Sequence, residues 1–151
     1  MSNDHIKIVT ENRKARHDYH IDEEIEAGMV LLGTEVKAMR LGRANLKDSY
    51  GKFKKGELFV CQMHISPYPF AFHDNHEPLR MRKLLLKKSE LKRLYGKMRE
   101  KGFALIPLKV YFRDGKAKIT MALARGKRKY DKRQTIKERE IKRELDRARK
   151  K

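Results

Sequence analysis

Apolar and polar residues alternate with a period of two from Tyr19 to Leu31. This period is typical of a strand that buries one face and exposes the other. Glu23 interrupts the apolar row, and Gly28 and Gly33 are positions at which such a strand can bend or bulge. The apolar face consists of Tyr19, Ile21, Ile25, Ala27, Met29 and Leu31. We therefore predict one long, half-buried strand in this segment.

Two hairpins are predicted further along the chain. A Lys-Lys-Gly turn joins residues 50–54 to a second strand, whose predicted apolar face carries Phe59, Cys61, Met63 and Ile65. Asp114-Gly115 joins segments 103–113 and 116–124, and an Asp-Gly pair between apolar runs is a strong hairpin signal. Both pairs of strands are expected to be antiparallel.

One amphipathic helix is predicted between Ser89 and Gly102. Ser89 is suited to cap its N-terminus, and apolar residues recur at helical spacing at Leu91, Leu94, Tyr95 and Met98. Segment 34–40 stays open between a continued strand and a short helix capped by Thr34. Segment 73–78 is predicted to be a loop.

Several short strands with turns between them, together with short helices, predict a mainly β fold. We expect a small closed antiparallel barrel of the oligonucleotide-binding type over residues 17–124. A chain of 151 residues supports one such domain with an appendage at its end. Residues 1–16 are polar and basic, which predicts a flexible arm, and residues 125–151 are predicted to form a basic tail.

The charge of the chain indicates a polyanionic partner. Lys and Arg number 39 against 20 Asp and Glu, which gives a net charge of +19, and 14 of the basic residues lie in segment 125–151. Neutralising phosphates with such cations releases condensed counterions and favours binding to nucleic acid. A membrane surface would require a broad apolar face, which the tail lacks. We also expect the protein to stay in the cytosol, because the first residues lack the apolar stretch of a secretory signal.

Candidate catalytic chemistry is sparse. Cys61 is the only cysteine, so one chain provides neither a disulfide framework nor a zinc site built from several cysteines. His17 and His20 are three residues apart, as are His73 and His76, and this spacing would hold a metal on a helix. Both segments have strand or loop character, so we predict histidines that face solvent or RNA. No enzyme activity and no cofactor are predicted, and a metal-dependent nuclease is kept only as a remote alternative.

Three segments are candidates for an RNA-binding surface. The first mixes cations with rings that can stack on bases, although it could equally be a solvated arm. The second sets cations before a run of three leucines, which cannot all face inward on a strand, so at least one is a candidate exposed contact; core packing or the entry to the helix is the more common explanation. The third carries Glu24 and Glu26, which can accept hydrogen bonds from a base or a 2′-hydroxyl, or simply face solvent. The residues of the first two are Asn12, Arg13, Lys14, Arg16, His17 and Tyr19, and Arg80, Arg82, Lys83 and Leu84–Leu86.

The tail has the sequence of a latent helix. Gly126 and the charged run after it oppose helix nucleation, whereas Thr135 and Glu138 have the spacing of a capping box. The apolar stripe of this segment is too thin to dock on a barrel, so isolated helicity should be low. We expect the tail to become ordered against a polyanion.

Four motifs of the chain, in order, resemble the small protein B (SmpB) family. They are "NRKARHDY", "EAGMVLLGTEVKAMRLGRANLKDSY", "MRKLLLKKSEL" and "ARGKRKYDKRQTIKERE". The resemblance runs from about Ile6 into the tail. It implies an oligonucleotide-binding barrel and a non-enzymatic role in trans-translation, acting as a monomer. The implied partners are the tRNA-like domain of transfer-messenger RNA (SsrA RNA), elongation factor Tu and the 70S ribosome.

The resemblance also implies roles for individual residues. Asn12, Glu26 and Leu85 match RNA-contact positions of the family. In the tail, the family's pattern matches Gly126, Lys127, Arg128, Asp131, Lys132 and Arg133. That segment is implied to enter the decoding centre and the vacant mRNA channel and to fold there against ribosomal RNA. Tyr130 and Ile141 depart from residues found in some members, and a general ribosome-assembly or structural RNA-binding protein is the alternative.

Overall fold

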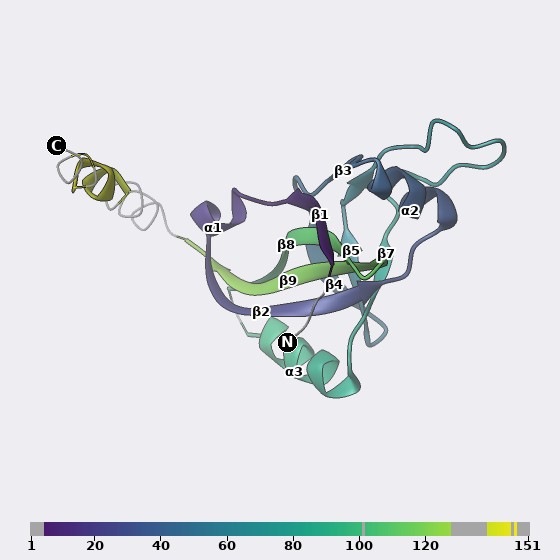
Figure 1. The fold of residues 1–151 in the computed structure, drawn as a ribbon. Helices are drawn as coiled ribbons and strands as arrows, with labels where there is room; N and C mark the ends of the chain where they lie inside the picture. The colour runs from purple at the N-terminus through teal and green to yellow at the C-terminus, as the bar shows by residue number, and fades with distance from the viewer. Residues whose placement is uncertain (1–4, 101, 128–138, 146, 148–151) are drawn as a thin grey trace.

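The structure is a computed structural model that describes residues 5–100, 102–127, 139–145 and 147. Strands dominate it, and the short helices α1, α2 and α3 lie around them (Figure 1). The elements are β1 (Ile6–Glu11), α1 (Ala15–Asp18), β2 (Tyr19–Met29), α2 (Gly33–Arg40), β3 (Ala44–Asn45), β4 (Tyr50–Lys54), β5 (Glu57–Cys61), β6 (His64–Ile65), β7 (Arg82–Leu85), α3 (Lys88–Met98), β8 (Phe103–Arg113) and β9 (Lys116–Gly126). The predicted mainly β fold with short helices is therefore confirmed.

Seven strands form one antiparallel sheet in the order β1-β8-β9-β2-β7-β5-β4, while β3 pairs only with β6. The sheet curves, so that β4 packs against β8 through side chains. A Cβ placed on Gly51 of β4 would lie 2.8 Å from the Leu105 Cβ of β8. None of the ladders among the described residues joins β4 to β8, so the seam is formed by packing.

Residues 1–16 were expected to be a flexible arm, and this is wrong for the part that the structure describes. Ile6–Glu11 pairs with β8 as an edge strand, and the Asp114 N–H donates to the His5 carbonyl across 3.0 Å. The polar composition misled the prediction because an edge strand needs only backbone hydrogen bonds. Ile6 and Ile8 remain about half exposed there.

A bulge in each of two strands, β2 and β8, explains why their apolar patterns are broken. The register of β2 against β9 shifts between Ile21 and Glu23, so side chains before and after Asp22 face opposite sides. Ile25 and Ala27 then point into the main core, whereas Ile21 joins a smaller cluster on the outside. A second shift in β8, between Pro107 and Lys109, has the same effect.

Both predicted hairpins are present, but the apolar face of the first was predicted only in part. Cys61, Met63 and Ile65 are buried as predicted, whereas Phe59 is only half-buried, and its neighbours Leu58 and Val60 are buried in its place. Gln62 has φ +60°, and this kink changes the phase, so that Met63 and Ile65 are buried again. The second hairpin turns at Asp114 and Gly115, as predicted.

The two longer helices begin where a glutamate caps them. In α3 the Glu90 carboxylate accepts the Lys87 N–H at 3.2 Å, so the helix starts one residue before Ser89, and Ser89 is not the cap. In α2 the Glu35 carboxylate accepts the Leu32 N–H at 2.7 Å. Segment 34–40 is therefore helical, and Thr34 is not its cap.

The main core lies between the concave face of the sheet and helices α2 and α3. Its fully buried members include Met39, Leu84 and Leu94. A smaller cluster lies on the opposite face, beneath α1, and consists of Ala15, Ile106, Leu108, Ala122 and Ala124. Helix α1 thus covers one end of this opposite face of the sheet and does not cover the rest.

The tail is described in part. Strand β9 runs to Gly126, so the predicted boundary at residue 125 falls inside a strand. Residues 139–145 are helical, and Ile141 and Leu145 are exposed there. The predicted cap at Thr135 and Glu138 lies outside the described residues.

Candidate nucleic-acid interface

Asn12 fixes the turn that carries the first group of predicted residues. Its amide nitrogen Nδ2 donates to the Pro107 carbonyl at 3.1 Å, and its backbone N–H donates to the Leu108 carbonyl at 2.7 Å. Ala15, three residues later, is buried against β8 and β9. The turn is thus held by the body, and Arg13 and Lys14 in it are exposed.

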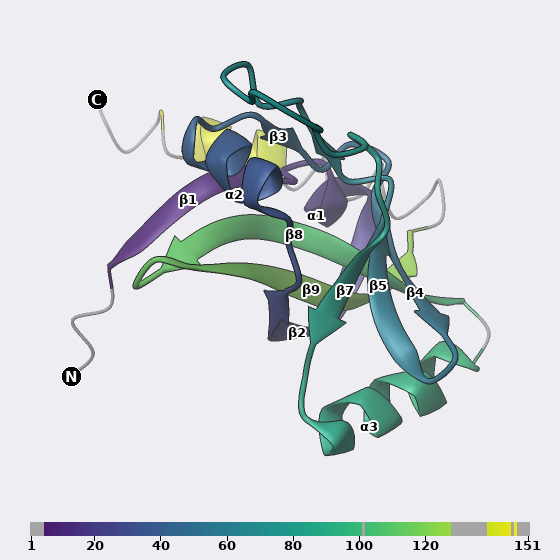
Figure 2. The same ribbon diagram turned by 90° about the vertical axis from the view of Figure 1, so that its right-hand side faces the viewer.

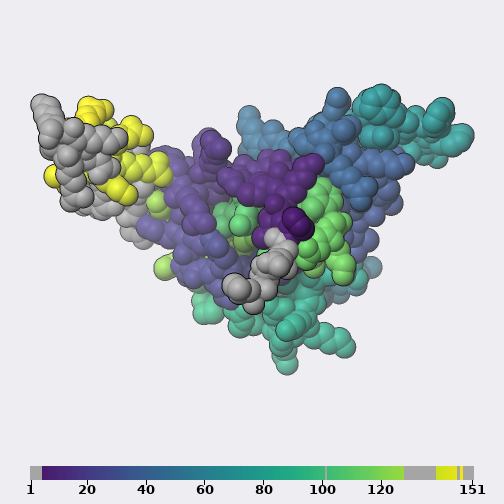
Figure 3. All heavy atoms as spheres, in the orientation of Figure 1, coloured from purple at the N-terminus to yellow at the C-terminus, as the bar shows by residue number. Residues whose placement is uncertain are grey.

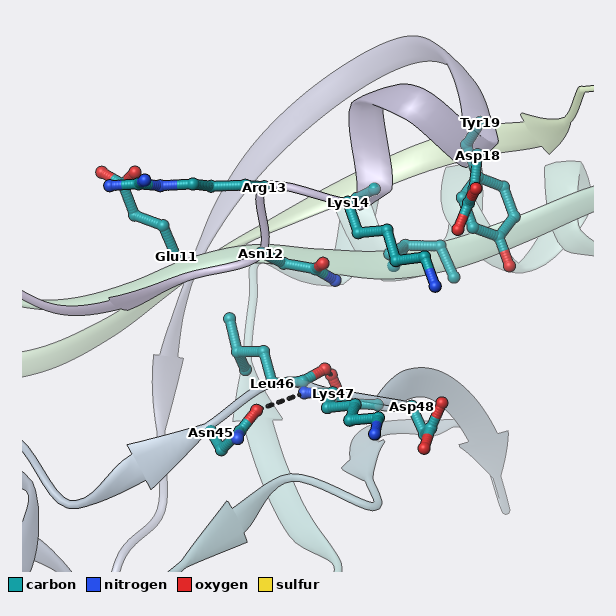
Figure 4. Close-up of a pocket in the computed structure, with 13 residues that line it drawn as sticks. Glu11, Asn12, Arg13, Lys14, Asp18, Tyr19, Asn45, Leu46, Lys47 and Asp48 are labelled. Atoms are coloured by element: carbon teal, nitrogen blue, oxygen red, sulfur yellow. Dashed lines mark hydrogen bonds between the residues drawn. The ribbon is translucent and has the colours of Figure 1, made fainter. Parts of the chain in front are cut away.

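A cleft of about 370 Å³ opens beside this turn (Figure 4). Asn12, Lys14 and Tyr19 line one wall, and Lys47 and Asp48, in the turn after β3, line the other. In Figure 4 the Lys14 side chain reaches toward the opening between the walls. The cleft combines ammonium groups with an aromatic ring, a set that can bind a phosphate and stack on a base.

A second cleft of similar volume lies on the other side of the turn and reaches the outer face of the sheet. Arg13 and Arg16 line it together with Glu24, Lys109 and Thr120. The Arg16 guanidinium forms an ion pair with the Glu24 carboxylate at 2.5 Å, and both side chains are exposed. This pair links α1 to the row of side chains on β2.

Glu26 stands next in that row and is held by two donors from β8. The Tyr111 hydroxyl donates to Glu26 Oε2, and Arg113 donates to the same oxygen at 2.8 Å. Burial, and then the hydrogen bond to Glu26, raise the pKa of Tyr111 above its ordinary value, which favours the protonated hydroxyl that donates this hydrogen bond. The carboxylate is thereby fixed in position at the surface.

Leu85 lies at the far end of the same row. Gly28 pairs with Leu85 across the β2–β7 ladder, and a Cβ on Gly28 would contact the Leu85 Cβ at 3.4 Å. Leu85 is 52% exposed, Leu84 is buried and Leu86 is half-buried. The prediction that one leucine of the run is exposed is therefore confirmed. Lys116 and Lys118 line a cleft of about 330 Å³ beside it.

Strand register joins these residues into one surface. Glu26 is opposite Thr120, and Thr120 is opposite Lys109; Gly28 is opposite Lys118, and Lys118 is opposite Tyr111. Residues opposite one another in a ladder project to the same side. We call this surface the outer face, and its residues are Arg16, Glu24, Glu26, Lys109, Tyr111, Lys118 and Leu85.

Arg82 does not belong to any binding surface, which corrects the prediction. Its side chain is 0% exposed, pairs with Glu35 and donates to the Met63 carbonyl at 2.5 Å. The cause is strand alternation, because Arg82 and Leu84 face inward while Lys83 and Leu85 face outward. Lys83 is partly exposed and forms an ion pair with Glu57 at 3.1 Å.

One histidine, His76, also differs from the prediction that the histidines face solvent or RNA. His76 is buried and lies between the Ile65 carbonyl, at 2.8 Å, and the Thr34 hydroxyl, at 2.9 Å. It is therefore a structural residue, whereas His73 is exposed and His17 is half-buried. Within the described part of the chain, no three His, Cys, Asp or Glu side chains gather into a group that could hold a metal ion. Burial raises the pKa of the Cys61 thiol, as expected for a structural cysteine.

Sequence reasoning missed three members of the outer face, namely Lys109, Tyr111 and Lys118. A signal for them was present, because polar residues alternate along "LKVYFR" and "KAKIT". The bulge at residue 108 obscured it, since the alternation changes phase at that point. Only the ladder places the Tyr111 hydroxyl against Glu26, 85 positions away in sequence.

The root of the tail lies beside α1. Gly126 pairs with Tyr19 in the β2–β9 ladder. The Lys127 N–H donates to the Asp18 carbonyl at 2.9 Å, and its ammonium donates to the Arg16 carbonyl at 3.2 Å. The remaining predicted tail residues lie outside the described residues; they are Arg128, Tyr130, Asp131, Lys132 and Arg133.

A curved antiparallel sheet with a basic, partly aromatic outer face defines a small β-sheet binding protein suited to nucleic acid. A family model described as SmpB protein matches residues 9–151. The chain therefore belongs to the SmpB family.

Known proteins similar to this chain agree with that assignment. The SsrA-binding protein of Syntrophobacter fumaroxidans is 60% identical over 144 residues, covering 95% of this chain and 89% of that protein. The SsrA-binding protein of Symbiobacterium thermophilum is also 60% identical, with 95% and 91% covered. A solved chain described as "tmRNA-SmpB: a journey to the center of the bacterial ribosome" is 47% identical, with a TM-score of 0.67, and covers 84% of this chain and 93% of that one. Separately, none of the helices that the structure describes is long and apolar enough to cross a membrane.

Proposed function

We propose that this protein binds the tRNA-like domain of transfer-messenger RNA and accompanies it to the ribosome in trans-translation. It acts by binding, without catalysis or a cofactor, in the cytoplasm and as a monomer, and elongation factor Tu shares the delivery complex. The relatives named SsrA-binding protein, and the similar chain described with the bacterial ribosome, support this proposal. The outer face is the observation that carries it.

The outer face suits a folded RNA better than a purely cationic patch would. Arg16, Lys109 and Lys118 can contact phosphates, while Glu26 is oriented to accept a hydrogen bond from a base amino group or a 2′-hydroxyl. Leu85 adds an exposed apolar contact beside it. We assign RNA contacts to Asn12, Arg13, Lys14, Arg16, His17, Tyr19, Glu26, Lys83 and Leu85.

The tail is assigned to the ribosome. Gly126 and Lys127 form the root of the tail on the body. In this proposal Arg128, Tyr130, Asp131, Lys132 and Arg133 enter the decoding centre and the empty mRNA channel. The density of positive charge in segment 125–151 supports it, because the channel is lined by RNA. The protein then divides into a binding domain up to Lys127 and a sensing tail after it.

We further propose that the sheet forms a closed barrel of the oligonucleotide-binding type, with its seam between β4 and β8. The close approach of Gly51 to Leu105 supports this closure. A closed seam would hold the curvature of β8 and β9, and hence the spacing between Asn12 and Leu85 on the outer face.

The decisive experiment compares Glu26→Ala and Leu85→Ala with the parent chain, using a tRNA-like fragment and an unrelated RNA hairpin at near-physiological salt. Selective loss of affinity for the fragment supports the proposal. Equal affinity of all three proteins for both RNAs would instead favour the alternative, a general ribosome-assembly or structural RNA-binding protein driven by charge.

A second experiment separates the two parts of the protein. A chain ending at Lys127 should keep its preference for the tRNA-like fragment, because the outer face is intact, yet fail to support tagging of stalled nascent chains. Normal tagging by the truncated chain would refute the role assigned to the tail. Ending at Lys127 rather than at residue 124 keeps strand β9 whole.

A further inference from the structure

A loop between β6 and β7 projects from the body and carries exposed aromatic rings. We call residues 68–75 of this loop the aromatic finger. Phe72 is 99% exposed and Phe70 is 69% exposed. Figure 3 shows the teal spheres of this segment standing out at the upper right of the molecule. Phe72 therefore contributes almost nothing to the core of this protein.

The finger is closed by its own hydrogen bonds. The Asn75 side chain accepts the Tyr68 N–H at 3.0 Å and donates to the Tyr68 carbonyl at 2.9 Å. The Ala71 N–H donates to the same carbonyl at 3.3 Å, and the Tyr68 and Phe70 rings meet edge to face with centroids 5.6 Å apart. The loop is thus built as a defined turn, which presents Phe72 at its tip.

The root of the finger is tied to the body. Buried His76 joins it to α2 and β6 through Thr34 and the Ile65 carbonyl. The Ile65 N–H donates to the Pro78 carbonyl at 3.0 Å, and buried Arg82 donates to the same carbonyl at 3.1 Å. This loop is anchored to the body and exposes a phenylalanine to water. Such a loop is preorganised to bind a partner.

The charges beside the finger indicate the chemistry of that partner. The Lys37 ammonium lies 5.7 Å from the centroid of the Tyr68 ring, and exposed Arg40 stands one turn further along α2. Exposed Arg43 follows, and its carbonyl accepts the Ser66 N–H. Asp74 and Glu77 are the acidic residues of the returning part of the loop, and both are exposed. An aromatic tip beside a row of cations matches an RNA strand, in which bases stack and phosphates follow at regular spacing.

The finger and Leu85 lie toward opposite ends of β7. The loop enters β7 at Arg82, and the strand ends at Leu85, just before α3. In Figure 2 the loop rises at the top of the molecule while α3 lies at the bottom. The finger is therefore a surface separate from the outer face that carries Leu85, and it can contact a different RNA.

We propose that Phe72 stacks on an unpaired base of ribosomal RNA while Lys37, Arg40 and Arg43 contact the neighbouring phosphates. This inference rests on the proposed function, because that function brings the protein to the ribosome. It adds a second RNA contact, made by the body of the protein and independent of the tail.

The test uses the full chain with Phe72 replaced by Trp, Leu or Ala, and measures the affinity for 70S ribosomes and, separately, for a tRNA-like fragment. Stacking on a base is worth roughly 1–3 kcal/mol, which corresponds to about 5- to 150-fold in affinity. We expect Phe72→Ala and Phe72→Leu to lose about that much affinity for ribosomes, and Phe72→Trp to keep it. None of the three should change affinity for the fragment. Ile6→Ala, a matched exposed apolar site on β1, should change neither.

The other outcomes are equally informative. Full affinity of Phe72→Leu for ribosomes, with loss in Phe72→Ala, would show that the tip fills an apolar protein pocket, and full affinity of both variants would show that Phe72 makes no contact; either result would overturn the proposal. Loss of affinity for the fragment alone would move the finger to transfer-messenger RNA and overturn the assignment to ribosomal RNA. If the parent chain itself fails to bind the fragment, the proposed function is wrong, and that result is distinct from any effect at Phe72.

A photo-crosslinking phenylalanine analogue at position 72 identifies the partner directly. The analogue should crosslink to ribosomal RNA, giving a product that ribonuclease degrades. A crosslink to a ribosomal protein would refute the stacking contact. The same analogue at position 95, on the half-exposed face of α3, serves as the control.

Discussion

Glu26 and Glu35 are chemically identical side chains with opposite roles, and burial decides between them. Glu26 is at the surface, where Tyr111 and Arg113 hold it in place. Glu35 is 0% exposed and forms ion pairs with Arg80 and Arg82. One carboxylate is therefore available for recognition, and the other is available only to the fold.

At the outer face we predict that Tyr111→Phe lowers affinity for the tRNA-like fragment by about 2- to 10-fold, because the lost hydrogen bond is worth roughly 0.5–1.5 kcal/mol. The fold should be unchanged, since the ring keeps its packing. Measuring binding for Tyr111→Phe, Glu26→Ala and the double variant tests the link. If Tyr111→Phe weakens binding equally in the presence and absence of Glu26, the hydroxyl does not act through that carboxylate.

In the interior we predict that Glu35→Ala lowers the free energy of unfolding by about 3–5 kcal/mol, because Arg82 would be left buried without its carboxylate. Urea denaturation measures the change. Glu57→Ala removes the exposed ion pair with Lys83 and serves as the control, with an expected change below about 1 kcal/mol. Similar values for the two variants would contradict the structural role of the buried pair.

The same glutamate predicts a pH dependence. Burial alone would raise the pKa of Glu35, but hydrogen bonds from Arg80, the Leu32 N–H and Arg82 hold the pKa below its usual 4.5. The ionised carboxylate therefore stabilises the fold fully above about pH 4.5, and this contribution is lost as the pH falls through the lowered pKa. We expect the difference in unfolding free energy between the parent chain and Glu35→Gln to shrink below pH 4.5. A difference that stays constant from pH 7 to pH 3 would refute this.

At the scale of elements, the contact between β4 and β8 determines whether the curved sheet holds its shape. Gly51 is the position where the strands meet, and a methyl group there would lie 2.8 Å from the Leu105 Cβ and 2.9 Å from the Met121 Cε. Both neighbours belong to the main core, so they have little room to move.

We predict that Gly51→Ala destabilises the protein by roughly 1–3 kcal/mol through overpacking at this seam. Gly96→Ala in α3 is the matched control, because nothing lies within 4 Å of the added methyl group. Alanine also favours a helix over glycine by about 1 kcal/mol, so the control should be neutral or more stable. Thermal or urea unfolding gives both values, and a neutral Gly51→Ala would argue against a closed seam.

At the scale of the whole molecule, the densest positive charge and the oriented polar groups lie in different parts of the chain. The positive charge is densest in segment 125–151, whereas the oriented groups lie on the outer face of the sheet. Charge supplies affinity for any RNA and responds to salt, while oriented groups supply preference for one RNA.

We therefore predict that a chain ending at Lys127 binds an unrelated RNA hairpin with a weaker salt dependence than the full chain. The slope of log affinity against log salt should fall by roughly one unit for each phosphate contact that the tail makes. Titrations at several salt concentrations measure this slope. Identical slopes would mean that the body supplies the charge contacts.

Sequence patterns predicted correctly those features that depend on residues close together in the chain. The mainly β composition, the Asp114-Gly115 hairpin and the exposed leucine of the third motif all followed from periodicity and turn chemistry. The start of α3 was predicted to within one residue, because its apolar residues recur at helical spacing, but the helix ends at Met98, four residues before the predicted Gly102. Family resemblance supplied Glu26 and Leu85 as candidates, but gave no reason for their geometry.

Only the tertiary structure decided what depends on distant neighbours. Strand register brought Tyr111 to Glu26, alternation within β7 buried Arg82 while exposing Leu85, and a polar segment became strand β1 by pairing with β8. His76 changed from a predicted surface residue to the anchor of the aromatic finger. Local sequence determines which elements form and how charge is distributed. Which side chains meet depends on bulges and ladder partners, and these are fixed only when the whole sheet assembles.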